Sequence, residues 1–162
     1  MDFALTEEQD AIFELAYAFG QDEIAPYAQA WDVIGEIPKD LWPKLGALGL
    51  GGIYVSEKYG GSGLSRLDAT LIFEALAMAC PSVGSFLSIH KMCGGMIDKF
   101  GSDDLRAKWL PKMCSMETVV SYCLTEPGSG SDAAALRTRA QRTNEGYSLT
   151  GNKAFISGGG YS

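Results

Sequence analysis

The spacing of apolar residues along this chain changes near residue 117. Before that point apolar residues recur every three or four positions, as expected when helices bury one face. After it, short runs rich in β-forming residues alternate with turns that contain glycine, which is typical of strands. The sequence therefore predicts an α+β fold, with an N-terminal all-α helical bundle over residues 1–117. The first strands of an antiparallel β-barrel-like domain are expected over residues 118–162.

The first helix has a clear start signal. Thr6 and Gln9 have the spacing of a capping box, and Ile12 and Phe19 follow at helical intervals. Gly20 is the expected stop, because glycine commonly follows the last turn of a helix. Further helices are expected over residues 23–31 and 38–48, a break over 49–52 and a loop over 59–63.

Start signals also precede the later helices. Ser65 with Asp68 predicts the start of a fourth helix. Pro81 is expected to end that helix and to open a fifth, which runs to about residue 100. Either Ser102 or Asp103 is expected to begin a last helix, which ends near residue 114. The apolar stripe predicted for the fourth helix consists of Leu64, Leu67, Leu71, Ala75 and Met78.

The second part of the chain contains several strand-like runs. Asn144-Glu145-Gly146 and Gly151-Asn152 predict tight turns between them. The chain stops at Gly158-Gly159-Gly160-Tyr161-Ser162, directly after the last run, so we expect the β-domain to be incomplete in this chain. The predicted strands cover residues 118–124, 136–143, 147–150 and 153–157.

Composition excludes several classes of function. The chain has 13 Lys and Arg against 20 Asp and Glu, a net charge of −7, whereas nucleic-acid-binding domains carry basic surfaces. No run approaches the ~20 apolar residues that a membrane-spanning helix needs. The opening Met1-Asp2-Phe3-Ala4 lacks the pattern of a targeting signal. We therefore expect neither a nucleic-acid partner nor a membrane.

The four cysteines and the single histidine do not form a metal motif. The sequence has no Cys-x-x-Cys pair, and His90 has only Cys93 at a spacing that would share a helix face. We expect no metal site, a partly buried helical His90, and four reduced thiols in the core. A Ser-His-Asp triad is not expected either, because His90 lies on a predicted apolar helix face.

A loop rich in glycine and hydroxyl groups follows the first predicted strand. In residues 122–132, glycines would let the backbone approach a ligand, and amides with Ser and Thr hydroxyls would donate to phosphate or carbonyl oxygens. The same composition also makes an ordinary turn. Gly128, Gly130 and Ala133 fit a loose dinucleotide-binding pattern, but strands follow instead of a helix, so a Rossmann site is not expected.

Two motifs in order resemble the acyl-CoA dehydrogenases. Tyr122-Cys123-Leu124-Thr125-Glu126-Pro127-Gly128-Ser129-Gly130-Ser131-Asp132 is similar to the flavin-loop signature of that family, a short strand followed by a loop. Gly151-Asn152-Lys153-Ala154-Phe155-Ile156-Ser157-Gly158 is similar to a second family motif at similar spacing. The Leu-Thr-Glu-Glu-Gln opening, the loop at residues 59–63 and Lys108-Trp109-Leu110-Pro111 agree as well, so the resemblance covers all 162 residues.

The resemblance implies FAD as cofactor and assigns roles to matching positions. Tyr122, Leu124 and Thr125 would lie along the flavin ring, with Thr125 hydrogen-bonding its pyrimidine edge. Ser131 would meet the flavin phosphate or the acyl-CoA thioester arm, and would thus also bind substrate. Glu126 is expected to be structural. The other implied cofactor-binding residues are Gly130, Phe155 (packed on the isoalloxazine), Ile156 and Ser157 (near N5).

The resemblance also implies an activity, α,β-dehydrogenation of an acyl-CoA thioester. Its motifs look most like the short branched-chain, isobutyryl-type members. The family's catalytic glutamate lies in a C-terminal helical domain that is absent from this chain, so no residue here is expected to be the base. Implied partners are acyl-CoA, electron-transfer flavoprotein and further copies in a homotetramer or dimer. The implied location is a bacterial cytoplasm or the mitochondrial matrix.

Three other interpretations remain open from the sequence. The chain could be a non-catalytic fragment that acts only as a folded helical interaction module. It could be an acyl-CoA oxidase or another flavin-dependent relative, and a nicotinamide-dependent dehydrogenase is a weaker alternative.

Overall fold

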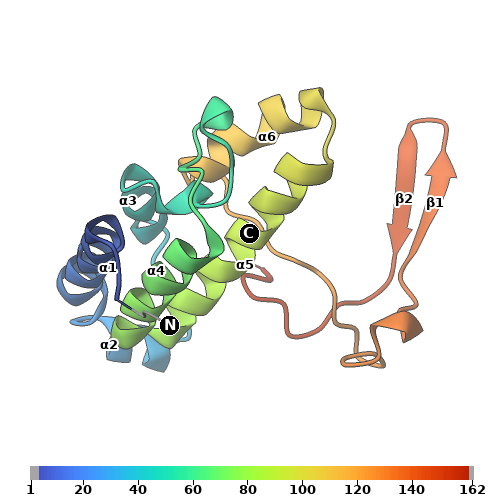
Figure 1. The fold of residues 1–162 in the computed structure, drawn as a ribbon. Helices are drawn as coiled ribbons and strands as arrows, with labels where there is room; N and C mark the ends of the chain where they lie inside the picture. Colours follow the sequence, from blue (N-terminus) through green and yellow to red (C-terminus); the bar gives the residue numbers. More distant parts are fainter. Residues whose placement is uncertain (1–3, 161–162) are drawn as a thin grey trace. The chain divides into compact units, whose positions relative to one another are not determined.

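The computed structural model describes residues 4–160. The chain divides into two compact units between Val120 and Ser121. The N-terminal Met1-Asp2-Phe3 and the final Tyr161-Ser162, on which the expectations about targeting and the chain end partly rested, lie outside the described residues. The first unit is helical and the second contains a two-stranded antiparallel sheet (Figure 1). The α+β fold class is therefore confirmed.

The helical unit is built around two long helices, α4 and α5. Helix α4 packs against α1 and α5, and α5 also packs against α6. The α-helices are α1 (Glu7–Phe19), α2 (Ala28–Ile34), α3 (Leu41–Ala47), α4 (Arg66–Ala79), α5 (Pro81–Phe100) and α6 (Asp103–Cys114). Shorter turns are η1 (Gly20–Ile24), η2 (Leu50–Gly52) and η3 (Glu57–Tyr59).

The predicted starts of α1, α4 and α6 are confirmed, whereas α2 and α3 start five and three residues later than predicted. Thr6 and Gln9 form the capping box of α1, and Ser65 and Asp68 form that of α4. The Ser102 hydroxyl accepts from the backbone N–H of Leu105 at the start of α6. These local side-chain bonds satisfy amides that the first helical turn leaves without intrahelical partners.

Helix α1 ends at Phe19 with Gly20 as its C-cap, as predicted, but the backbone does not leave the helical path there. Gly20 has φ −59° and ψ −44°, and the helical path continues through the π-turn η1 to Ile24. A Cβ at Gly20 would lie 3.2 Å from the Cβ of Ala79 at the end of α4, so the absent side chain permits close packing between elements. The second helix consequently starts later than predicted, at Ala28, and ends at Gly35 in the left-handed conformation (φ 72°).

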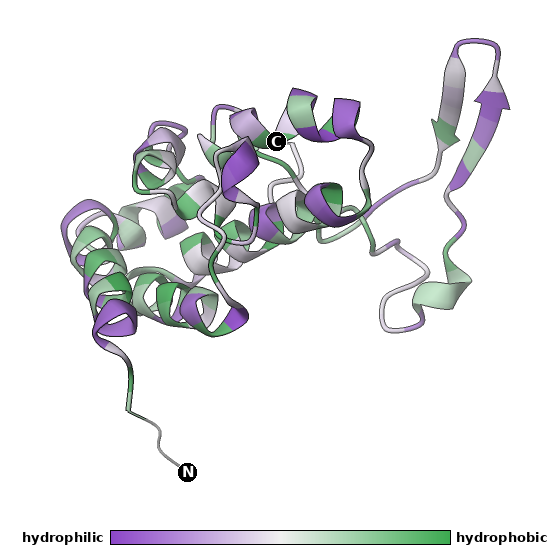
Figure 2. Cartoon of the chain, turned by 45° about the horizontal axis from the view of Figure 1, so that its top comes forward, coloured by the Kyte–Doolittle hydropathy of each residue, from purple (hydrophilic) through white to green (hydrophobic). Residues whose placement is uncertain are grey.

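The predicted apolar stripe of α4 is wrong at two of its positions. Leu67 and Met78 are 53% and 61% exposed, whereas Leu71 and Ala75 are buried. Because α4 contacts helices on two sides, its buried arc also takes in Ala69, Ile72 and Leu76. Figure 2 shows the resulting alternation of hydrophilic and hydrophobic bands along the helices. No helix within residues 4–160 is both long and apolar enough to cross a membrane.

His90 is fully buried, not partly buried as predicted. Its Nδ1 accepts from the backbone N–H of Val120 at 3.2 Å, and its Nε2 lies 3.0 Å from the carbonyl oxygen of Met113. Accepting at Nδ1 requires that Nε2 carry the proton and donate to Met113. Burial lowers the pKa of His90 although the bond to Met113 opposes the shift, so the ring is neutral. His90 thus joins α5 to the end of the helical unit.

The four cysteines, all within the described residues, form no disulfide, but not all belong to the core. Cys80 and Cys114 are buried, whereas Cys123 is exposed, so the prediction of four core thiols is wrong at that position. Burial, with Asp98 nearby, raises the pKa of Cys114 to about 11 and keeps that thiol protonated. In the part of the chain that the structure describes, no group of three or more His, Cys, Asp or Glu could hold a metal ion.

The second unit contains one hairpin. Strands β1 (Arg139–Thr143) and β2 (Gly146–Thr150) pair antiparallel, with Ala140 opposite Leu149 and Arg142 opposite Tyr147. A short turn, η4 (Ala133–Ala135), precedes them. Every residue of both strands is exposed, and β1 is mostly hydrophilic (Figure 2).

Two predicted strands do not form among the described residues. Residues 118–124 and 153–157 are irregular. The physical reason is that a strand needs a continuous ladder of partners. Among the described residues, a single backbone bond links these two stretches, from Ala154 to Thr125, and Thr125 directly follows the first segment. The backbone at Phe155 also has φ +55°, which is incompatible with an extended strand.

Candidate flavin site

The structure brings the two sequence motifs side by side. The backbone N–H of Ala154 donates to the carbonyl oxygen of Thr125 at 2.9 Å. Lys153 Nζ donates to the carbonyl oxygen of Leu124 at 2.9 Å. Ser121 Oγ donates to the carbonyl oxygen of Ser157 at 2.5 Å. Three positions of the first segment, residues 121, 124 and 125, are thus bonded to three positions of the second, residues 157, 153 and 154.

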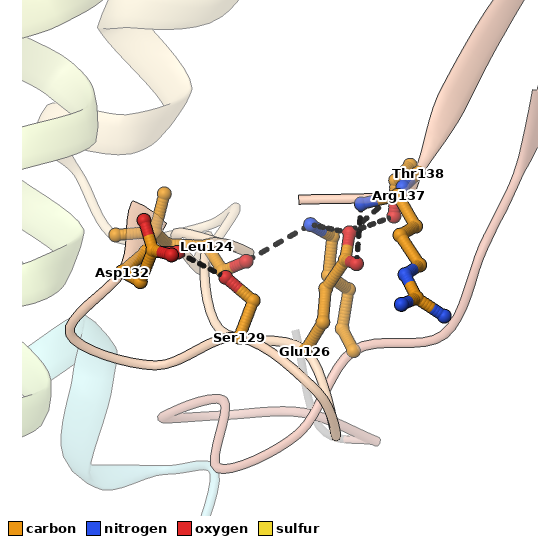
Figure 3. Close-up of polar contacts among 7 residues, drawn as sticks. Leu124, Glu126, Ser129, Asp132, Arg137 and Thr138 are labelled. Carbon is orange, nitrogen blue, oxygen red and sulfur yellow. Dashed lines mark hydrogen bonds and ion pairs between the residues drawn. The ribbon is translucent and has the colours of Figure 1, made fainter. Parts of the chain in front are cut away.

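Glu126 is the most heavily bonded side chain of this unit (Figure 3). Its carboxylate accepts from the backbone N–H of Arg137 at 2.7 Å and of Thr138 at 2.9 Å, and from the Thr138 hydroxyl at 2.5 Å. Lys153 Nζ lies 3.0 Å from Oε1. These donors, the Thr138 hydroxyl foremost, lower the pKa of Glu126 to about 2. A carboxylate so engaged is structural, as predicted, because its lone pairs are already occupied.

The loop between the motifs is closed by its own hydrogen bonds. Glu126 and Ser129 exchange two backbone bonds of 2.9 and 3.0 Å, and the Ser129 hydroxyl donates to the carbonyl oxygen of Asp132 at 2.5 Å (Figure 3). A Cβ at Gly128 or Gly130 would meet nothing within 4 Å. The loop is therefore a well-made turn whose glycines face open space. This geometry is compatible with both sequence interpretations, an ordinary turn and a loop whose backbone a ligand can approach.

The predicted site residues differ in exposure. Phe155 is 97% exposed and Tyr122 is 37% exposed. Gly130 and Ser131 are exposed in the loop, whereas Leu124, Thr125, Ile156 and Ser157 are half-buried. The bonds between the motifs hold Tyr122, Leu124 and Thr125 close in space to Phe155, Ile156 and Ser157, whereas Gly130 and Ser131 lie on the intervening loop.

These residues fit a planar, partly polar ligand such as a flavin. A phenyl ring that is almost fully exposed, held by a left-handed backbone at φ +55°, is apolar surface that a stacked ring system would remove from water. Hydroxyl groups of Thr125 and Ser157 flank it on the paired segments and can donate to carbonyl or ring-nitrogen acceptors. Both of these donors are neutral hydroxyl groups, so a bound ring would not have to desolvate a charge at either of them.

Family comparisons identify the chain. The profile described as "Acyl-CoA dehydrogenase, N-terminal domain" matches residues 6–117, and "Acyl-CoA dehydrogenase, middle domain" matches residues 121–162. The chain belongs to the acyl-CoA dehydrogenase family. The resemblance drawn from the two motifs is thereby confirmed.

Individual acyl-CoA dehydrogenase relatives extend beyond this chain. It is 53% identical over 156 residues to the mitochondrial isobutyryl-CoA dehydrogenase of Dictyostelium discoideum, covering 96% of this chain and 38% of that protein. The structure of butyryl-CoA dehydrogenase from Megasphaera elsdenii matches with a TM-score of 0.91 at 36% identity, over 100% of this chain and 44% of that one. An FAD complex of PigA matches with a TM-score of 0.87 at 34% identity, over 96% and 42%. The chain thus spans about two fifths of these relatives.

Sequence reasoning missed the hydrogen-bond network that joins the acyl-CoA dehydrogenase motifs. Lys153 lies inside the second motif but received no role, and Thr138 received none either. The signal that could have found Lys153 is a lone lysine in a short apolar run, opposite a segment that contains an acidic residue. Nothing in the sequence around Thr138 points to Glu126, because that contact depends on how the loop folds back.

Proposed function

We propose that this chain is the flavin-binding portion of an FAD-dependent enzyme that dehydrogenates a short, branched acyl-CoA thioester. Family membership and 53% identity to an isobutyryl-CoA dehydrogenase support the reaction and the substrate class. The single observation that carries the proposal within the structure is the bond from Ala154 to Thr125, since it joins the two flavin motifs.

We propose the following roles at the flavin. Tyr122 and Leu124 lie along the ring, and the Thr125 hydroxyl donates to its pyrimidine edge. Phe155 covers the ring face, and its exposure of 97% leaves that surface free to do so. The Ser157 hydroxyl and amide approach N5, with Ile156 beside them, and Gly130 and Ser131 meet the phosphate or the thioester arm.

FAD supplies the hydride acceptor of such a reaction. The residues of this chain hold and orient it. A fixed Thr125 donor at the pyrimidine edge favours negative charge there, because a donor held in place needs no reorganisation. The Phe155 ring excludes water from the face it covers. No residue of this chain is assigned as the base that removes the α-proton; we expect that base in a C-terminal helical domain outside this chain.

We further propose the domain assignment and the partners. Residues 1–117 form the N-terminal helical domain, and residues 118–162 form the start of the middle β-domain. Acyl-CoA is the substrate and electron-transfer flavoprotein the electron acceptor. The whole protein forms a homotetramer or dimer, in a bacterial cytoplasm or the mitochondrial matrix.

The test is to purify the whole gene product and to titrate it with FAD and acyl-CoA. We expect stoichiometric flavin whose visible absorbance is bleached by isobutyryl-CoA. The 162-residue chain by itself is expected to bind FAD weakly and to show no turnover. A whole protein without flavin would support the interaction-module alternative. Bleaching by NADH instead of acyl-CoA would support nicotinamide-dependent chemistry, and rapid reaction of the reduced protein with oxygen would support an oxidase.

A further inference from the structure

Lys153 lies against both residues that flank Thr125 in the first motif. Its Nζ donates to the carbonyl oxygen of Leu124 at 2.9 Å and lies 3.0 Å from the carboxylate of Glu126. The next residue, Ala154, donates its backbone N–H to Thr125 itself at 2.9 Å. Three consecutive residues of one motif are thus bonded by two consecutive residues of the other.

Glu126 extends the same connection to a third segment. Its carboxylate also accepts from both backbone and side chain of Thr138, directly before β1. The Glu126 side chain is 7% exposed and that of Lys153 is 23% exposed. A charge-assisted bond shielded from solvent in this way is stronger than one between exposed side chains.

We propose that Glu126 and Lys153 are a positioning pair that sets the register between the two flavin motifs. Through this pair, the Thr125 hydroxyl and the Phe155 ring are held in one relative arrangement. The inference rests on the proposed flavin site, but neither residue of the pair is assigned a contact with the ligand. Backbone bonds alone would not fix the register, since among the described residues a single one, from Ala154 to Thr125, joins these irregular segments.

The experiment compares the full chain with Glu126→Gln, Lys153→Met, Lys153→Arg and the Glu126→Gln/Lys153→Met double variant. Two readouts are used: hydrogen exchange of the Thr138 and Ala154 amides by NMR in the 162-residue chain, and the Kd for FAD with the same substitutions in the whole gene product. Lys112 and Glu117 provide matched controls, because they form an ion pair at 3.7 Å with side chains 54% and 67% exposed. Lys112→Met and Glu117→Gln are therefore the same chemical changes at an unshielded pair.

We expect Glu126→Gln and Lys153→Met each to accelerate exchange at Ala154 by about tenfold, by raising the population of the open state. Both are expected to weaken FAD binding by a similar factor. Because the two residues act as a unit, the double variant should change the exchange rate and the Kd for FAD no more than the single variant with the larger effect does. Lys153→Arg should retain most of the protection, and the controls should leave both readouts unchanged.

The outcomes separate this inference from the proposed function. Unchanged exchange at Ala154 in Glu126→Gln and Lys153→Met, or fully additive effects in the double variant, would overturn the positioning role. Weaker FAD binding without faster exchange would also overturn it, since that result places the side chains on the ligand. If the unmodified chain and the whole gene product both fail to bind FAD, the proposed function fails, and the exchange data still decide whether the pair sets the register.

Discussion

Gln9 and Asp68 each complete a capping box, and their side chains bond to each other at 3.2 Å. Gln9 caps the start of α1 and Asp68 caps the start of α4, which are 59 positions apart in the sequence. The two helix starts are therefore joined by the same side chains that satisfy their free amides. This arrangement adds a tertiary contact to two local signals.

The first prediction concerns this pair of caps. Gln9→Ala and Asp68→Ala should each cost about 1 kcal/mol of unfolding free energy, the net value of a hydrogen bond, because each removes the bond from the third helical residue back to the N-cap amide. The double variant should cost less than the sum, because both single changes remove the shared bond. Urea denaturation followed by circular dichroism measures all three values. Strict additivity would show that the 3.2 Å contact contributes nothing to stability.

The second prediction concerns Lys91, which is 1% exposed. Its Nζ is the one buried side-chain polar atom within residues 4–160 that has no hydrogen-bond partner, and it lies over the rings of Phe73 and Tyr54 at 5.0 and 5.8 Å. The other titratable groups near it are Arg66, which lies 4.1 Å from the centroid of the same Tyr54 ring, and the neutral imidazole of His90. Burial lowers the pKa of Lys91 to about 6, so the amine is neutral in the folded chain at pH 7.

Between pH 6 and pH 10.5, which is the ordinary pKa of lysine, the Lys91 amine is protonated in the unfolded chain but not in the folded chain. Stability should therefore rise with pH across that window, by up to about 1.4 kcal/mol per unit. Lys91→Met should stabilise the chain at pH 7, and the gain should shrink toward pH 10. Lys44→Met, at an exposed lysine paired with Glu23, is the control without this pH dependence. A gain independent of pH would contradict a neutral Lys91.

The third prediction concerns His90. Replacing it with Phe keeps the ring volume but leaves the N–H of Val120 and the carbonyl of Met113 without their partner, which should cost about 2–3 kcal/mol or more. The pKa of His90 is lowered in the folded state, so its contribution is present above pH 6.5 and is lost as the pH falls below that value. Thermal melts from pH 5 to 8 should show this slope in the unmodified chain and not in His90→Phe. If the melting temperature depends on pH equally in the unmodified chain and in His90→Phe, His90 is not the group responsible.

The fourth prediction contrasts two glycines. A Cβ at Gly61 would collide with the backbone carbonyl of Val55, whereas a Cβ at Gly95, inside α5, would make an ordinary contact of 3.6 Å with Tyr54. Gly61→Ala should therefore destabilise the helical unit by at least about 1–3 kcal/mol. Gly95→Ala should stabilise it by up to about 1 kcal/mol, because alanine is the better helix former. Melting temperatures of the two variants should move in opposite directions.

The sequence predicted those elements whose causes are local. The starts of α1, α4 and α6 followed from hydroxyl caps, and Pro81 marked the boundary between α4 and α5. The hairpin followed from the turn at residues 144–146. The flavin motifs were visible as ordered residue patterns, because their spacing along the chain is itself the signal.

Other features depended on contacts that no local pattern encodes. The backbone continues past Gly20 as a π-turn, and the missing Cβ at Gly20 leaves room for Ala79. The buried arc of α4 is set by the helices on either side. The predicted strands at 118–124 and 153–157 lack partner strands among the described residues and so stay irregular.

By itself, the sequence determined the fold class, most helix boundaries and the family, since capping, periodicity and motif order act over a few residues. Only the tertiary structure decided that Lys153 meets Glu126 across 27 positions, that Phe155 is exposed, and that the amine of Lys91 is buried. The physical reason is that burial and hydrogen-bond partners depend on which segments are neighbours in space, and residue spacing along one chain does not specify that.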